Sequence, residues 1–393
     1  MKNEIIYLDH AATTPVSEKV MKAMLPYFSE KFYNPSAPYV QALEVRHDYE
    51  DAKNEIARCI GAKGDELVMT AGATESINLA FSASFREEGD EILIGAFEHH
   101  AVLNSADKYG VRKFINVKKD GVIDLEDLRS KISPKTKLVS VMLANNETGV
   151  IQPIAKIAEI IREERARRLQ NGETLPIFLH SDASQGVGQL DVSVSRLGVD
   201  MLTLNAGKIY GPKQTGLLWA SREIEFEAQI VGGGQERGLR SGTENVANVI
   251  GFAKAIQLVE KYRKKEVERL RRLKAIFEST FRDNFKEGEE FFFIGNHKKQ
   301  LASHISVSFP GVDAERIIFA AETKGVLVAT GSACAANKGT RSQTLTAMGL
   351  SPEEADGSLR ISLGALSSEE NSQVAASILC ELIRNEIERV SGR

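Results

Sequence analysis

The strongest constraint on the fold of this 393-residue chain is a regular alternation of short apolar runs with longer amphipathic stretches. The apolar runs are typical of buried strands and lie at residues 66–69, 91–95, 137–143, 176–180, 201–204 and 216–219. Helical patterns lie between most of them, for example at residues 74–85 and 154–168. This alternation predicts an α/β fold with a largely parallel sheet. Because such sheets bind ligands at the carboxyl ends of their strands, polar residues that follow a strand are candidate site residues.

The pattern changes after Gly251, where a second group of elements begins. One long helical pattern is followed by three runs typical of strands and a closing helical pattern, at residues 252–281, 291–294, 302–309, 326–329 and 369–390. These elements predict a smaller α+β domain, with the boundary inside the long helix near residue 262. We therefore expect a large domain of residues 15–262 and a small domain of residues 1–14 and 263–393.

The composition excludes several classes of protein. Lys and Arg number 50 against 54 Asp and Glu, a net charge of −4, which offers no excess positive charge for nucleic acid or an anionic membrane. The three cysteines, Cys59, Cys334 and Cys380, include no C-x-x-C pair, so we expect neither a disulfide framework nor a metal site. No signal peptide and no run of about 18 apolar residues is visible. We therefore expect a cytoplasmic protein.

Two segments that follow predicted strands suit one cofactor. Lys208 comes just after the run 201–204, between small residues, where its amine has room for a Schiff base with a carbonyl cofactor. Asp182 follows the run 176–180 and is suited to keep the pyridine nitrogen of pyridoxal phosphate (PLP) protonated, while Gln185 can donate to the phenolic oxygen. Taken alone, Lys208 is equally compatible with a surface loop, and Asp182 with a helix N-cap.

Further candidates lie after other strands. Residues 70–76 place small residues and Thr74 at the start of a helix, which suits a phosphate group, although a plain capping box is the alternative. His99 follows the run 91–95, and its imidazole is suited to stack on a flat ring or to transfer protons. The glycine-rich segment 232–243, which ends at Thr243, suits an anion.

Cys334 differs from the other two cysteines in its surroundings. It lies in residues 329–340, a segment rich in small residues, whereas Cys59 and Cys380 lie in helical patterns beside apolar residues. A thiolate in an exposed loop is a good nucleophile, so Cys334 is a candidate reactive group. An incidental loop cysteine is the alternative.

As an ordered set, these segments resemble the cysteine desulfurases, which are class V, fold-type I PLP enzymes. Each motif is weak alone, but the order is specific. The matching residues are 7–15, 72–76, 98–99, 145–149, 182 with 185, 208–213, 240–243 and 331–334. The sequence Gly331-Ser332-Ala333-Cys334 resembles the nitrogenase-type and iron–sulfur-assembly-type members.

The resemblance implies how the cofactor is held. It implies a homodimer in which the large domain binds PLP and the small domain carries the cysteine loop. In it, Lys208 forms the Schiff base, Asp182 contacts the pyridine nitrogen, Gln185 contacts the phenolic oxygen and His99 stacks on the ring. The phosphate is held by backbone and side-chain groups of the residues Ala73, Thr74 and Asn205, with Thr243 arriving from the partner subunit.

The resemblance also implies the reaction. Arg360 binds the carboxylate of L-cysteine with help from Asn146, and Lys208 moves the proton at the substrate Cα. Cys334 attacks the substrate sulfur, which leaves L-alanine and an enzyme persulfide. The sulfur then passes to an acceptor protein, such as an iron–sulfur scaffold, for cluster assembly or other thiolated products.

The chain departs from the family pattern beside Lys208. The family usually has His directly before the lysine and Ser two residues earlier, and here these are Gly207 and Asn205. We therefore predict weaker or differently built phosphate binding. Two alternatives to a desulfurase remain: another class V PLP enzyme, such as an aminotransferase or a selenocysteine lyase, which does not need Cys334, and a non-catalytic relative that acts as a binding partner.

Overall fold

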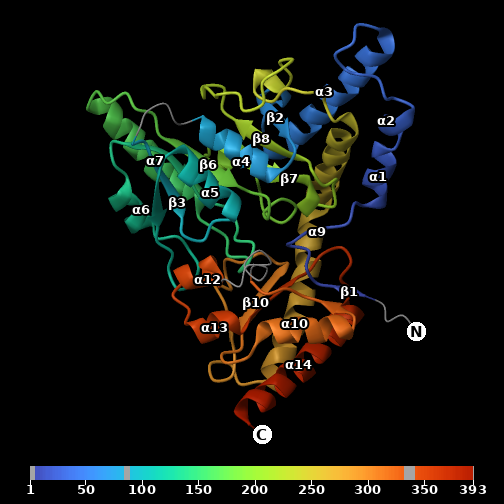
Figure 1. Ribbon diagram of the computed structural model, residues 1–393, viewed down its shortest axis with the longest axis vertical. Coiled ribbons are helices and arrows are strands. Elements are labelled where there is room, and N and C mark those ends of the chain that lie inside the picture. Colours follow the sequence, from blue (N-terminus) through green and yellow to red (C-terminus); the bar gives the residue numbers. More distant parts are fainter. Residues whose placement is uncertain (1–4, 84–88, 332–340, 393) are drawn as a thin grey trace.

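The computed structural model describes residues 5–83, 89–331 and 341–392, and Figure 1 shows them as two lobes. The upper lobe is built around one large sheet and the lower lobe around two smaller ones. The long helix α9 (Val246–Asn284) runs from one lobe into the other. No helix in the described ranges has the length and apolar character needed to cross a bilayer.

The upper lobe contains a seven-stranded sheet in the order β2-β8-β7-β6-β5-β3-β4. Its strands are β2 (Leu67–Thr70), β3 (Glu91–Gly95), β4 (Val111–Ile115), β5 (Thr136–Ser140), β6 (Phe178–Asp182), β7 (Met201–Asn205) and β8 (Gly216–Ala220). Strand β8 is antiparallel to its neighbours β2 and β7, and the other pairs are parallel. The predicted α/β class with a largely parallel sheet is confirmed.

Helices cover both faces of this sheet. They include α3 (Val40–Ile60), α4 (Ala73–Ser82), α5 (His100–Tyr109), α6 (Leu125–Lys131), α7 (Ile154–Gln170) and the short α8 (Val194–Leu197). Along β2, Leu67 and Met69 pack into one apolar core and Val68 packs into another. A strand such as β2 therefore buries side chains on both faces, which explains why the inner strands of the sheet are near-continuous apolar runs in the sequence.

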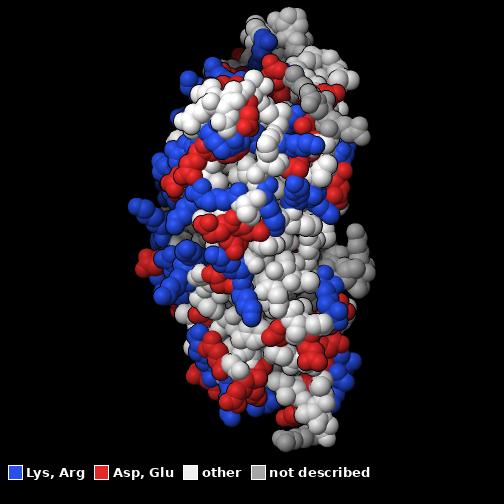
Figure 2. All heavy atoms as spheres, turned by 90° about the vertical axis from the view of Figure 1, so that its left-hand side faces the viewer, with Lys and Arg blue, Asp and Glu red and all other residues white. Residues whose placement is uncertain are grey.

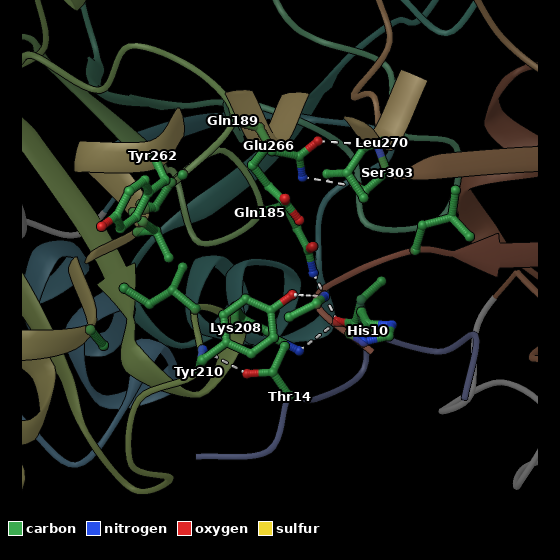
Figure 3. A pocket seen from close by; sticks show the side chains of 18 of the residues that line it. His10, Thr14, Gln185, Gln189, Lys208, Tyr210, Tyr262, Glu266, Leu270 and Ser303 are labelled. Carbon is green, nitrogen blue, oxygen red and sulfur yellow. Dashed lines mark hydrogen bonds between the residues drawn. The ribbon is translucent and has the colours of Figure 1, made fainter. Parts of the chain in front are cut away.

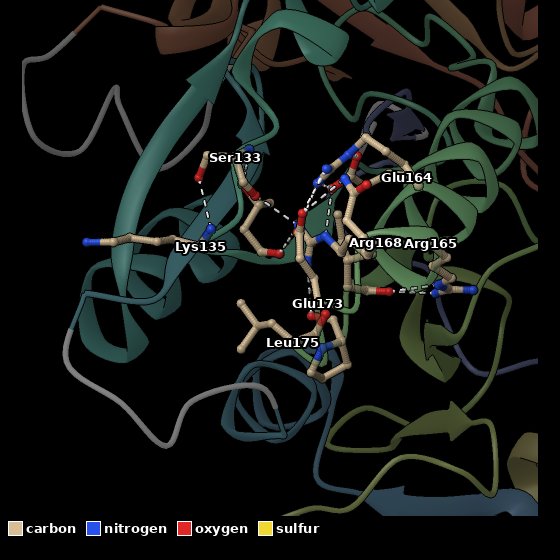
Figure 4. A network of polar contacts seen from close by, with 12 residues as sticks. Ser133, Lys135, Glu164, Arg165, Arg168, Glu173 and Leu175 are labelled. Atoms are coloured by element: carbon tan, nitrogen blue, oxygen red, sulfur yellow. Dashed lines mark hydrogen bonds and ion pairs between the residues drawn. The ribbon is translucent and has the colours of Figure 1, made fainter.

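A buried arginine ties α7 to the loops at the start of β5 and β6 (Figure 4). Arg168 is 2% exposed and donates from Nη2 to the carbonyl oxygens of Ser133, at 2.8 Å, and Thr136, at 2.9 Å. Its Nη1 donates to the carbonyl of Leu175 at 3.1 Å, and its Nε to Glu164 at 2.6 Å. The charge is therefore buried with a carboxylate and several carbonyl acceptors, as a buried ion requires.

The lower lobe holds the smaller sheets. Strands β9 (Phe292–Phe293), β10 (His304–Ser308) and β12 (Ser358–Ser362) form an antiparallel sheet, and β1 (Ile6–Tyr7) pairs in parallel with β11 (Val326–Leu327). The helices of this region are α10 (Ala314–Thr323), α12 (Gln343–Ala347), α13 (Pro352–Asp356) and α14 (Glu369–Ser391). Helices α1 (Glu18–Met24) and α2 (Pro26–Ser29) lie instead beside the first half of α9 (Figure 1).

The two lobes have separate apolar cores that α9 connects. Residues of α9 from Val246 to Ile256 pack into the core of the large sheet. Further along the same helix, Leu270, Phe277 and Phe281 pack into the core of the lower lobe, which also includes Leu8. On the surface, Lys and Arg lie interspersed with Asp and Glu on the face that Figure 2 shows, in keeping with the small net charge.

Candidate active site

A cavity of about 480 Å³ lies where the carboxyl ends of the large sheet face the lower lobe. It is the place where most of the predicted site residues meet, although the chain supplies them from distant segments. The predicted residues that line it are Ala73, Thr74, His99, Asn146, Asp182, Gln185, Asn205, Lys208 and Arg360. The grouping follows from the sheet, because β6 and β7 deliver Asp182 and Asn205 at the same edge.

Lys208 lies in the wall between this cavity and a second one. It ends a short 3₁₀ turn (Ala206–Lys208) directly after β7, and its Nζ donates to the carbonyl oxygens of Ala11, at 2.8 Å, and Ala12, at 2.6 Å. Gln185 donates to the same Ala11 carbonyl at 3.0 Å. Figure 3 shows the second cavity, of about 360 Å³, which Lys208 and Gln185 also line. Because Lys208 lines two cavities, it does not lie in an exposed surface loop, which was the alternative interpretation of this lysine.

Asp182 and Asn205 each use one side-chain oxygen to stabilise the local turn. Asp182 Oδ1 accepts the N–H of Ser184 at 2.9 Å, and the residues that follow form turns, so Asp182 caps no helix. Asn205 Oδ1 accepts the N–H of Gly207 at 2.9 Å. The amide of Asn205 therefore keeps its Nδ2 group as a donor toward the cavity that it lines.

His99 is a neutral imidazole with one side open to the cavity. It caps the N-terminus of α5, where its Nδ1 accepts the N–H of Ala101 at 3.1 Å, so the ring proton of the neutral form lies on Nε2. The protein around the ring removes enough water to lower its pKa; Asp182 opposes this shift, and Lys208 and His100 add to it. A flat, uncharged ring facing the cavity suits stacking on another aromatic ring.

The start of α4 forms an anion cradle. The helix begins at Ala73, after Gly72. Gly72 has a φ of 139°, which glycine adopts without strain and other residues do not. Gly72 supplies no side-chain cap, and the first-turn N–H groups of a helix have no partner within the helix. With the helix dipole and the hydroxyl of Thr74, this end favours a phosphate. The lysine, the carboxylate, the flat ring and the cradle together fit the donor and acceptor groups of PLP.

Arg360 is arranged to keep two donors available. It lies on β12, is 3% exposed, and donates from Nη2 to Oδ1 of Asp9 at 2.7 Å. Its Nη1 donates to the carbonyl oxygens of Gly331, at 3.1 Å, and Asn146, at 3.3 Å. Its Nε is buried and has no acceptor among the described residues. A guanidinium has five N–H groups, so the Nε–H and one N–H of Nη2 remain for a ligand such as a carboxylate.

Two buried carboxyl groups line the cavity that the sequence reasoning did not assign. Glu98 accepts the N–H of Met142 at 2.7 Å, and burial raises its pKa well above the usual range, with a further rise from Asp182. Burial also raises the pKa of Glu147, which accepts hydrogen bonds from hydroxyl groups near the start of α12. Both lie within motif segments that the sequence analysis lists, residues 98–99 and 145–149, and an acidic residue in a segment that follows a strand is the signal that could have identified them.

The remaining predicted residues are not part of this cavity as described. Thr243 follows the loop that contains Glu236–Gly238 and is not among the residues that line the cavity. Cys334 lies outside the described residues. The residues on either side of its segment adjoin the site, because Gly331 accepts from Arg360 and Arg341 lines the cavity. Burial raises the pKa of Cys59 and of Cys380 to about 11, so both are weak nucleophiles near neutral pH.

The sequence matches one family model over most of its length. The model of the class-V aminotransferases matches residues 6–374. Among curated proteins, the chain is 39% identical to "Cysteine desulfurase IscS 1" of Archaeoglobus fulgidus, over 98% of this chain and 97% of that protein. It is 38% identical to "Cysteine desulfurase IscS" of Dictyoglomus turgidum, over 98% of this chain and 95% of that protein.

Solved structures show the same architecture. A "NifS-like protein" superposes with a TM-score of 0.87 at 30% identity, and the match covers 97% of this chain and 100% of that one. The apo structure of a cysteine desulfurase from Thermococcus onnurineus NA1 superposes with a TM-score of 0.82 at 25% identity, covering 97% of this chain and 95% of that one. The expected fold class is therefore confirmed over both lobes.

Proposed function

Because the chain belongs to the class-V aminotransferase family and, within it, to the cysteine desulfurases, we propose that it removes sulfur from L-cysteine with PLP bound at Lys208. The observation that carries this proposal is the convergence of Lys208, Asp182, His99 and Arg360 on one cavity. An amine, an acid for a ring nitrogen, a stacking ring and a carboxylate-binding group are the parts that this chemistry needs.

We propose a residue for each part of the cofactor. Lys208 supplies the amine, Asp182 the carboxylate beside the pyridine nitrogen, and His99 the stacking ring. Ala73, Thr74 and Asn205 supply phosphate donors, and we propose Thr243 of the partner subunit as a further one. Gln185 contacts the phenolic oxygen. When bound, PLP supplies an electron sink for the bonds at the substrate Cα.

The reacting groups of the chain then have separate tasks. Arg360 binds the substrate carboxylate through its two remaining donors, and Asn146 lies beside it. The amine of Lys208 takes and returns the proton at the substrate Cα. The thiolate of Cys334 attacks the substrate sulfur, so a C–S bond breaks and an S–S bond forms. L-Cysteine and the enzyme thiol give L-alanine and the enzyme persulfide, a balance that needs no outside oxidant or reductant.

The proposal also covers the location, the oligomeric state, the sulfur acceptor and the domain division of the protein. We propose a cytoplasmic homodimer that passes the persulfide sulfur to an acceptor protein, such as an iron–sulfur scaffold, for cluster assembly or thiolation. We also propose that residues 15–262 form the cofactor-binding domain and that residues 1–14 and 263–393 form the domain that carries the cysteine segment. The two separate apolar cores support this division.

The function is tested on the purified protein in two steps. The visible spectrum with and without borohydride, followed by peptide mapping, should show a pyridoxyl group fixed to Lys208 and absent from Lys208→Ala. The wild-type enzyme should then convert L-cysteine to equal amounts of L-alanine and, with a reductant present, sulfide. A colourless protein that takes up no added PLP contradicts the proposal, as does a coloured one that forms no alanine.

A further inference from the structure

Glu147 is a buried carboxylate that contacts the start of the chain beyond Cys334. It is 7% exposed and lines the cavity. Its Oε2 accepts a hydrogen bond from the hydroxyl of Ser342, and its Oε1 accepts one from the hydroxyl of Thr344 at 3.2 Å. Ser342 in turn caps α12 by accepting the N–H of Leu345 at 3.1 Å. One carboxylate therefore fixes the segment 342–344 and the helix that starts there.

The same carboxylate lies against the chain that precedes Cys334. A Cβ added at Gly331 would lie 2.8 Å from Glu147 Oε2, so the backbone passes close to the carboxylate and a side chain here would require that carboxylate to move. The carbonyl of Gly331 accepts from Arg360 at 3.1 Å. Both ends of the segment 332–340 therefore meet at Glu147, beside the guanidinium expected to bind substrate.

Glu147 is itself held rigidly. Its N–H donates to Oδ1 of Asn145 at 2.9 Å, and the same oxygen accepts the N–H of Thr148 at 2.8 Å. The amide of Asn145 donates to the carbonyl of Phe97 at 3.1 Å, which fixes the turn to the large lobe. Glu147 therefore has a fixed position relative to the large lobe, and it restricts the positions of Gly331 and Ser342, which lie beside it.

We propose that Glu147 is a positioning residue, which fixes both ends of the segment that carries Cys334 relative to Arg360. The inference rests on the proposed function and deepens it. The thiol of Cys334 must reach a substrate whose carboxylate is bound by Arg360. Cys334 and Arg360 therefore have to be positioned relative to each other. A carboxyl side chain suits the role because it has an acceptor oxygen for each of two hydroxyl groups.

The test compares Glu147→Ala and Glu147→Gln with the wild-type holoenzyme. Glu147→Ala should lower kcat for L-alanine formation about 100-fold, the loss expected when a reacting group is displaced by about 1 Å. The KM for L-cysteine should change less than threefold, and the visible spectrum of bound cofactor should stay unchanged. Glu147→Gln keeps one acceptor and should retain an intermediate kcat.

A double-mutant cycle separates positioning from an independent effect. The Ser342→Ala/Thr344→Val variant should also have a lower kcat than the wild type. Adding Glu147→Ala to it should cause little further loss, because the Glu147 carboxyl and the two hydroxyl groups act as one unit. The rate constant for alkylation of Cys334 by iodoacetamide, followed by mass spectrometry, should rise in both variants. If Glu147→Ala does not fold, the Ser342/Thr344 variant alone carries the test.

The matched control is Glu354→Ala, which removes a comparable contact from the adjacent helix α13, where Glu354 accepts the N–H of Ser351 at 2.6 Å. It should leave kcat and the alkylation rate at wild-type values. An unchanged kcat in Glu147→Ala, or a raised KM with kcat retained, overturns the proposal while the desulfurase function stands. A wild-type enzyme that forms no alanine fails the proposed function instead.

Discussion

The buried Arg360 and the partly buried Asp9 form an ion pair at 2.7 Å although 351 positions separate them in the chain. Asp9 follows β1, and Arg360 lies in the centre of β12, so the pair joins the first and last strands of the lower lobe. The carboxylate compensates the buried charge and orients the guanidinium without using all of its donors. It therefore leaves donors of Arg360 for the second carboxylate that the proposed function requires.

Arg360→Lys should raise the KM for L-cysteine about 10- to 100-fold. Lysine retains the charge beside Asp9 but loses the pair of parallel donors, and a hydrogen bond to a charged group contributes about 1.5–3 kcal/mol. The cofactor absorbance should be unchanged. Steady-state kinetics with cysteamine, which has no carboxylate, provide the control, because its turnover should differ little between the two enzymes. An equal loss for both compounds would mean that Arg360 does not bind the carboxylate.

Gly207→His should slow the loss of PLP during dialysis. A side chain at this position requires a small shift of Asn205, because the atom nearest to an added Cβ is Asn205 Oδ1 at 3.3 Å and the next are atoms of Lys213 from 3.8 Å. An imidazole there adds a donor beside the expected phosphate position. Gly207→Ala is the matched control, since it adds bulk without a donor and should lose PLP at the wild-type rate. The rates are followed by the visible absorbance that remains with the protein.

Cys334→Ser should abolish the formation of sulfide and of the enzyme persulfide, while the cofactor spectrum and its response to L-cysteine remain. The Cys59→Ala/Cys380→Ala variant should keep full activity, because burial raises the pKa of both thiols to about 11. Mass spectrometry after one turnover should find the added sulfur atom on Cys334 alone. Unchanged turnover in Cys334→Ser would favour another class V PLP enzyme.

Acid should destabilise the protein through two buried histidines. His180 lies between the hydroxyl groups of Ser140, at 2.8 Å, and Thr203, at 2.9 Å, and burial lowers its pKa to about 3. Burial lowers the pKa of His304 to about 3 as well. Above the unfolded pKa, about 6.5, both states are neutral and the stabilisation is complete. As the pH falls from 6.5 toward 3, only the unfolded state binds protons, so each histidine costs about 1.4 kcal/mol per pH unit.

Urea unfolding of the holoenzyme at pH 7.5, 6.5 and 5.5 checks this dependence. His180→Gln should show a smaller loss of unfolding free energy between pH 6.5 and 5.5 than the wild type. His47→Gln changes an exposed histidine, and this variant should show the same dependence of unfolding free energy on pH as the wild type. A wild-type stability that rises on acidification through this interval would contradict the argument.

The sequence predicted most of the strands that form apolar runs and missed β4 and β12, which have charged residues at their centres. Strand β4, with Arg112 and Lys113, is an edge strand of mixed polarity and gives no apolar run. Strand β12 contains Arg360, whose burial depends on Asp9, and no local pattern reveals a partner so far away in the chain. The contact of Glu147 with Ser342 is equally non-local. Asp182 and Lys208 were predictable because each lies at or just after the end of its own strand, so a local pattern is enough to locate them.

The path of the first residues has a consequence for biosynthesis. Residues near the N-terminus lie between β11 and β12, and the carbonyl groups of Ala11 and Ala12 bind the amine of Lys208. Because domains fold as the ribosome releases them, the segment that contains β1 must wait for β11 and β12, which are translated more than 300 residues later. The cavity that Lys208 and Arg360 line is therefore completed only after β12 has been translated.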